Sequence, residues 1–324
     1  MKAERKLAFR ALCAAAWIAA VATAQAADLQ ADTAVAFDRY VGLTEMRLNQ
    51  EKNGTIPFLW VDRLLGAQRH DADARLYRGE VLVRRMETRE AGRSIDIPGG
   101  LCHHWVGTVF VPGVTLDRTL ALMQAYNSYQ DTYRPAVRRS TVLSRDGDRF
   151  KVALQLFMKK VVSVVLDTEY DVSYVRVSAA RTQVRSVTTR IAEVQHPGTF
   201  GEQERPVGHD SGFLWRFNNY CALEERDHGT YVQCESVSLS REIPMGLGWL
   251  IGPFVTGIPR EALEFTLATM RQALTAGHER AAEERPPGET LQHPARSGRS
   301  SAGRSSATFA SIKSRTHPSS SLVQ

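Results

Sequence analysis

Apolar and polar residues alternate with a period of two over most of the chain between residues 76 and 241, a pattern typical of strands with one buried face. The segments concerned are 76–88, 93–98, 102–111, 137–145, 150–158, 167–178, 183–194, 213–223 and 231–241, with 161–166 apolar on both faces. Helical spacing of apolar residues occurs at 33–48, 115–134 and 259–276. This order of elements predicts an α+β fold in which a mainly antiparallel sheet packs against a long C-terminal helix.

A stretch of thirteen residues before the last helix, 246–258, has no charge but contains four glycines and a proline. Because glycine and proline disfavour regular structure, we expect a pliable loop that displays Trp249 and Phe254. Pro259 suits the first turn of the helix that follows. Such a loop can cover an apolar cavity, so the sequence indicates a container for a molecule more than a reaction.

The chain is expected to divide into four parts, which are a signal peptide (1–26), an N-terminal helical extension (27–74), a main domain (75–276) and a tail (277–324). In the extension, Thr33 can cap the first helix and Asn53-Gly54 can end it. The polar stretch 68–74 is interpreted as the break before the main domain. No internal repeat is present.

The first 26 residues have the features of an export signal. Four basic residues precede a short apolar stretch, Ala11 to Val21, and Ala24-Gln25-Ala26 fits the small-x-small cleavage rule. A retained membrane anchor is the alternative, but a span needs roughly 20 apolar residues. With no later apolar segment of that length, we expect a periplasmic or secreted protein without an integral membrane segment.

The formal net charge of +6 suggests a nucleic-acid binder, but the excess lies at the ends of the chain. Residues 1–27 and 277–324 each contribute +3, so residues 28–276 are neutral. Because phosphate binding needs a concentrated basic face, we expect no nucleic-acid partner. The basic tail has ten serines after residue 296 and is expected to be disordered. It could contact a membrane surface transiently.

Two registers are open to the hairpin formed by 213–223 and 231–241. A three-residue loop sets Phe217 opposite Leu239 and keeps the apolar faces together, with Cys221 and Cys234 on opposite faces. A two-residue loop would align the two cysteines for a cross-strand disulfide but would turn Leu239 away from the aromatic side. We favour the first register, with the disulfide as the alternative. Cys102 is expected to be a small buried residue.

Catalytic and metal-binding patterns are weak. Asp210-Ser211-Gly212 echoes the nucleophile turn of trypsin-like proteases, but Phe213 replaces its second glycine and no segment supplies the base. No histidine or cysteine spacing is specific for a metal, and no nucleotide-binding fingerprint is present, so we expect no metal and no cofactor. His104, or a carboxylate such as Glu193, is the candidate general base if the protein is an enzyme.

The hairpin 212–241, the run Ser236 to Pro244 and the segment Gly246 to Glu261 resemble segments of the START-like, or SRPBCC, superfamily. The resemblance covers residues 75–276 and implies a helix-grip fold, in which a curved antiparallel sheet wraps around a long C-terminal helix and leaves a cavity. Members bind lipids, sterols, polyketides or other hydrophobic molecules, and a minority are cyclases or hydrolases. Residues 28–74 depart from the minimal family pattern. They are expected either to cap the cavity or to form a separate helical appendage.

Placed on that fold, one set of residues is predicted to line the ligand cavity, with polar members orienting a headgroup. They are Tyr126, Tyr129, Arg190, Phe213, Trp215, Phe217, Asn219, Trp249, Phe254, Leu263, Leu267 and Met270. The leading hypothesis is an exported binding or carrier protein for a hydrophobic, lipid-like small molecule. An enzyme of the same fold, cyclase-like or hydrolase-like, is the second, and a structural envelope protein with a filled core is the third.

Overall fold

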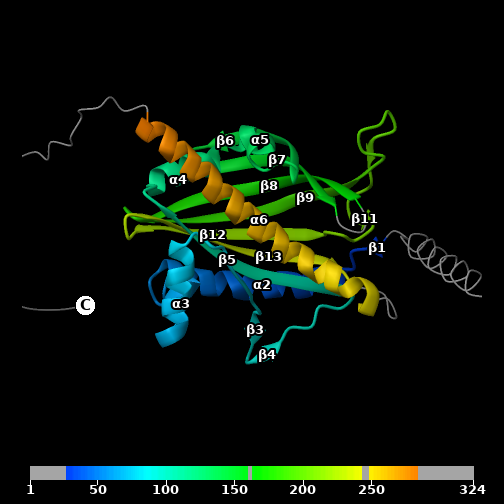
Figure 1. The fold of residues 1–324 in the computed structure, drawn as a ribbon. Coiled ribbons are helices and arrows are strands. Elements are labelled where there is room, and N and C mark those ends of the chain that lie inside the picture. The colour runs from blue at the N-terminus through cyan, green and yellow to red at the C-terminus, as the bar shows by residue number, and fades with distance from the viewer. Residues whose placement is uncertain (1–26, 160–162, 243–247, 284–324) are drawn as a thin grey trace, which may run out of the picture. The chain divides into compact units, whose positions relative to one another are not determined.

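A large antiparallel sheet with helices on both faces organises the chain (Figure 1). The computed structural model describes residues 27–159, 163–242 and 248–283, and in the last helix it describes the side chains from 257 to 278. All these residues belong to one compact unit, Met1–Glu284. The predicted signal peptide and most of the predicted tail lie outside the described residues.

The described strands pair in the order β2-β5-β13-β12-β9-β8-β7-β6, with β10 added to β9, and every pairing is antiparallel. The two short pairs β1–β11 and β3–β4 lie outside this sheet. The bounds are β1 Ala27–Asp28, β2 Leu82–Arg85, β3 Arg89–Glu90, β4 Arg93–Ser94, β5 Gly100–Pro112, β6 Val137–Asp146, β7 Arg149–Lys159, β8 Ser163–Ser178, β9 Arg181–Gln195, β10 Gln203–Glu204, β11 His209–Asp210, β12 Arg216–Arg226 and β13 Gly229–Arg241.

The helices cover both faces of the sheet. Their bounds are α2 Ala31–Lys52, η1 Trp60–Arg63, α3 Gly66–Tyr77, α4 Leu116–Gln124, η2 Tyr126–Ser128, α5 Tyr129–Thr132 and α6 Gly248–Glu283. Helix α6 crosses one face, which we call the helix-facing side, and α2, η1 and α3 pack on the other, the outer side (Figure 1). The predicted helix-grip arrangement of a curved sheet and a long C-terminal helix is therefore confirmed.

The N-terminal extension covers the outer side of the sheet, so it does not cap the interface with α6. Phe37 and Tyr40 of α2 pack against Val237 and Leu239 of β13. The helix begins at Ala31, so Thr33 is not its cap, and the Thr33 hydroxyl instead donates to the Pro98 carbonyl at 2.6 Å. The predicted end of this helix at Asn53-Gly54 is confirmed.

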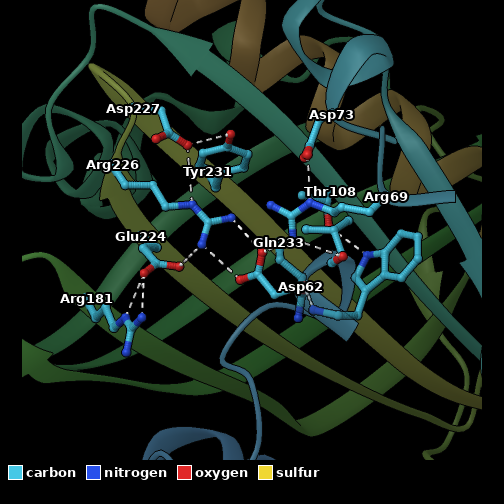
Figure 2. A network of polar contacts seen from close by, with 12 residues as sticks. Asp62, Arg69, Asp73, Thr108, Arg181, Glu224, Arg226, Asp227, Tyr231 and Gln233 are labelled. Atoms are coloured by element: carbon cyan, nitrogen blue, oxygen red, sulfur yellow. Dashed lines mark hydrogen bonds and ion pairs between the residues drawn. The ribbon is translucent and has the colours of Figure 1, made fainter. Parts of the chain in front are cut away.

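The polar break expected at 68–74 is wrong, because these residues lie in α3. The helix has only two buried residues, Ala72 and Leu76, which is too sparse an apolar stripe to read from sequence. Polar contacts hold this segment on the sheet, as Figure 2 shows. Asp62 accepts from Arg226 at 2.7 and 2.9 Å and from Arg69 at 2.6 Å.

Two uncharged hydrogen bonds fix η1 on the sheet. The Trp60 indole donates to the Thr108 hydroxyl on β5, and its backbone N–H donates to Gln233 on β13, both at 2.7 Å. These polar groups surround an apolar cluster that includes Leu59, Val61, Leu76, Phe110 and Tyr231. Residues on both sides of the predicted boundary at 74/75 therefore share one core.

The β12–β13 hairpin has the register that the sequence analysis did not favour. Asp227 and His228 form a two-residue turn, both with positive φ (55° and 57°), and Cys221 pairs with Cys234 in a disulfide. The prediction assumed that only one face of β13 is buried. In the structure Val237 and Leu239 face α2 while Cys234 faces α6, so both faces of β13 pack against apolar clusters.

Two helix predictions also change. The loop expected at 246–258 is wrong from Gly248 onward, because α6 begins there, and Pro259 lies within the helix. Glycine and proline propensities are weak priors that tertiary context can override. Helix α6 also extends to Glu283, beyond the predicted end at 276. The helix expected over 115–134 is interrupted at Ala125 and continues as η2 and α5.

The remaining differences concern strand lengths. Only Leu82–Arg85 of the predicted strand 76–88 is a strand, and 93–98 contributes only the two-residue β4. The segments 161–166 and 167–178 are largely one continuous strand, β8.

Candidate functional site

At one end of the interface between α6 and the helix-facing side of the sheet, the side chains are almost completely buried. We call this end the closed end. Leu263, Leu267, Met270 and Leu274 form the buried stripe of α6, each at most 6% exposed. They share a cluster with strand residues that are at most 3% exposed, which are Val109, Val111, Cys221, Leu223, Val232 and Cys234. Gly107 of β5 lies so near that an added Cβ would come within 2.6 Å of the Leu267 side chain.

Toward the N-terminal part of α6, the same side of the sheet is less fully buried. Trp105 of β5 and Phe217 and Asn219 of β12 keep intermediate exposure, although β12 and β13 are central strands. Trp105 lies two residues before Gly107, and Asn219 two residues before Cys221, so both face α6. We call this region, with Ser236 of β13, the open end.

Polar atoms at the open end lack protein partners. The Ser236 hydroxyl and Oδ1 of Asn219 are buried without a hydrogen bond within the described part of the chain. Ser236 is 5% exposed and lies directly opposite Asn219 in the β12–β13 ladder. Within the described residues, Asn219 Nδ2 has one long contact, of 3.5 Å, to Sγ of Cys221. Buried polar atoms are normally paired, so the Ser236 hydroxyl and Oδ1 of Asn219 are available for hydrogen bonds to a ligand.

His103 adds a titratable group on the same side. Its Nε2 lies 2.9 Å from the Ser240 hydroxyl, and both residues are buried. Burial, assisted by the charge of Arg85, lowers the pKa of His103 to about 4. The ring is therefore neutral near pH 7 and acts as a hydrogen-bonding group.

The structure brings seven of the predicted lining residues to the helix-facing side, in two groups. Leu263, Leu267 and Met270 form the closed end, with Tyr126 buried in the same cluster. Phe217 and Asn219 lie at the open end, and Phe217 also packs against the cluster. Tyr129 also packs against the cluster, but its hydroxyl donates to the Met123 carbonyl at 2.5 Å. The Tyr126 hydroxyl lies 2.6 Å from that of Tyr174, so neither phenol is free for a headgroup.

Three predicted lining residues lie elsewhere. Trp215 packs in the cluster beneath α2 on the outer side, because it precedes the first residue of β12 and does not follow its alternation. Phe213 is 42% exposed. Arg190 pairs with Glu204 of β10, so its charge is already matched at the strand surface. Trp249 and Phe254 lie in the first turns of α6, but their side chains are outside the described residues.

The candidate general bases are engaged in other contacts. His104 faces the outer side, where its Nε2 lies 2.6 Å from Glu235 and its Nδ1 lies 2.8 Å from the Tyr40 hydroxyl. Glu193 accepts from the backbone N–H and hydroxyl of Ser211, at 2.9 and 3.0 Å, and holds that loop. Both side chains therefore have structural partners.

Sequence reasoning missed Trp105, His103 and Ser236. Alternation places Trp105 and His103 on one face and His104 on the other, but it does not say which face meets α6. Ser236 was hidden by the incorrect hairpin register. Two surface grooves lie away from this interface, one beside Lys151 and Arg185 and one beside Pro57 and Arg181.

Among the described residues, no group of histidine, cysteine and carboxylate side chains could hold a metal ion. The described helices include none with the length and apolar character of a membrane span.

No family model and no curated protein matches the sequence. Similar solved structures include a STAR-related lipid transfer protein from Xanthomonas axonopodis, with 17% identity over 59% of this chain and 98% of that chain and a TM-score of 0.38. Human STARD10 has 8% identity over 68% and 85% of the two chains, with a TM-score of 0.37.

A START superfamily protein from Mycobacterium smegmatis has 12% identity over 55% of this chain and 97% of that chain, with a TM-score of 0.36. The order of the strands and the path of α6 across one face decide the architecture. This chain has a START-like fold. The proposals that follow rest on its own residues.

Proposed function

We propose that this START-like protein binds and carries a hydrophobic, lipid-like small molecule between α6 and the sheet. The observation that carries the proposal is the difference between the two ends of the interface. The closed end buries its residues almost completely, whereas Trp105, Phe217 and Asn219 on the same side keep exposed surface. Apolar rings beside a few convergent polar groups are the usual lining of a small-molecule site.

Catalysis has less support at this place. An enzyme would need a base with a pKa near the working pH, within reach of a second titratable group. His103 has its pKa lowered to about 4, and its hydrogen bond is to the Ser240 hydroxyl. Within the described residues, no carboxylate is hydrogen bonded to His103. A polar anchor in an apolar site suits binding better than proton transfer.

The test is native mass spectrometry of the purified full chain, followed by extraction and identification of bound molecules. We expect a hydrophobic molecule at near one-to-one stoichiometry, and uptake of the neutral dye Nile red after the molecule has been extracted. Asn219→Phe, which fills the open end, should reduce uptake at least fivefold. Val175→Phe, at an exposed position of β8, is the matched control and should not. A ligand-free chain that also takes up no dye would contradict the carrier and favour a filled structural core.

We also propose that the protein is exported. The support is the basic leader, the apolar stretch and the Ala24-Gln25-Ala26 site, together with the Cys221–Cys234 disulfide. Disulfides persist in oxidising compartments and are rare in the reducing cytosol.

Thiol titration of the unreduced, denatured protein tests export together with the intact mass. Loss of residues 1–26 removes Cys13 and should leave Cys102 as the one reactive thiol. A cytosolic chain of full mass with four reactive thiols would contradict export.

A further inference from the structure

Asn219 and Ser236 form a cross-strand pair whose polar atoms point to the interface with α6. They are opposite each other in the ladder, two residues from the disulfide pair Cys221–Cys234 on the same face. Side chains of directly opposite residues have Cβ atoms about 4.5 to 5.5 Å apart. One small ligand group can therefore contact both.

The two side chains offer complementary hydrogen bonds. Oδ1 of Asn219 is an acceptor, and the Ser236 hydroxyl can donate or accept. Neither atom has a partner within the described part of the chain, and Ser236 is 95% buried, since its exposure is 5%. An alcohol hydroxyl, which donates one hydrogen bond and accepts another, satisfies both atoms. A carboxylate only accepts, so it would leave Oδ1 of Asn219 unpaired and facing a negative charge.

The surroundings of the pair are uncharged. The neighbouring positions on the same face are Ser186 of β9, Phe217 of β12 and Ser238 of β13. Among the described residues, Arg85 lies on the same side, because it pairs with Trp105, but it is exposed on edge strand β2 and separated from β13 by β5. Because a buried charge without a counter-charge is strongly disfavoured, a neutral group fits this position.

We infer that the Asn219–Ser236 pair is the polar anchor for an uncharged ligand that carries a hydroxyl group, such as a long-chain alcohol or a sterol. This inference rests on the proposed binding function and names its ligand class. The resulting selection rule is that the site prefers a hydroxyl group over an anionic group. The hydroxyl lies against the centre of the sheet, and the hydrocarbon extends along the rings of Trp105 and Phe217.

Displacement of Nile red from the full chain tests the rule with two matched ligand pairs. Hexadecanol is compared with hexadecanoate, and cholesterol with cholesterol sulfate. We expect the alcohol of at least one pair to displace the dye at a tenfold lower concentration than its anionic counterpart. In Ser236→Ala and Asn219→Leu the preference should fall below threefold. Ser144→Ala, on β6, is the matched control and should keep it.

The possible outcomes distinguish failure of this inference from failure of the proposed binding function. Equal or tighter binding of the anions would overturn the anchor while leaving the carrier intact, and Arg85→Gln would then show whether the edge cation binds them. Failure of the chain to take up Nile red or any of the four ligands would overturn the carrier and the anchor together. The wild-type comparison requires no substitution, so a variant that fails to fold does not remove the test.

Discussion

His104 and Glu235 are joined by a 2.6 Å contact between Nε2 and Oε1, and both side chains are 2% exposed on the outer side of the sheet. Arg47 of α2 binds the same carboxylate and also Glu51, which in turn binds Arg63. Burial alone would raise the pKa of Glu235, but the hydrogen bonds and charges of His104 and Arg47 hold it below its ordinary value. Helix α2 is thus attached to the sheet through an ionised carboxylate.

Replacement of Glu235 should therefore destabilise the fold strongly. Glu235→Ala leaves His104 and Arg47 without their shared acceptor, and the expected loss in the free energy of unfolding is about 3 to 5 kcal/mol. Glu90→Ala is the matched control, since Glu90 pairs with Arg39 on the surface and should cost at most about 1 kcal/mol. Urea denaturation measures both, and similar losses would contradict the structural role of the network.

Lowering the pH should reduce the free energy of unfolding because of the buried His103 ring. The pKa of His103 is lowered to about 4 by burial and by Arg85, so the unfolded chain takes up a proton first as the pH falls below about 6.5. The stability contributed by the neutral ring is then lost between about pH 6.5 and pH 4. From pH 7.5 to 5, the wild type should lose about 2 kcal/mol more than His103→Gln. Parallel pH profiles of the two proteins would show that the ring titrates normally.

The disulfide should contribute to stability by restricting the unfolded chain. Cys221 and Cys234 are 13 residues apart, and loops of this size correspond to about 3 kcal/mol in the chain-entropy model. Reduction before urea denaturation should lower the free energy of unfolding by about 2 to 3 kcal/mol. Cys102→Ser should show the same sensitivity to the reductant, because Cys102 is not in a disulfide. An identical denaturation curve with and without reductant would exclude a role for the bridge.

The close approach of α6 to β5 depends on a glycine. An added Cβ at Gly107 would meet Leu267 at 2.6 Å and Leu263 at 3.3 Å, so Gly107→Ala should cost about 1 to 3 kcal/mol. Gly42 lies inside α2 with no atom within 4 Å of an added Cβ, so Gly42→Ala should stabilise by up to about 1 kcal/mol. Thermal unfolding compares the two, and an equal or higher melting temperature for Gly107→Ala would mean that α6 can move away.

The candidate site was only partly predictable. The α6 stripe of Leu263, Leu267 and Met270 follows from helical spacing alone, and the structure places it against the sheet. Trp215 shows where this reasoning fails, because alternation was extended to a residue that lies outside β12. The partners of Arg190 and Glu193 come from the distant segments 203–211, which no local pattern connects to them.

The periodic pattern by itself determined the α+β class, the order of most elements and the apolar stripe of the last helix, because these depend on neighbours along the chain. Tertiary structure decided the hairpin register and which side of each strand meets α6. From Gly229 to Ser240, every residue of β13 is buried, so the strand lies between two helical layers and has no exposed face. Without a difference in burial between its two faces, the alternation that normally sets a register carries no information, and the two-residue turn and the contacts of both layers set it instead.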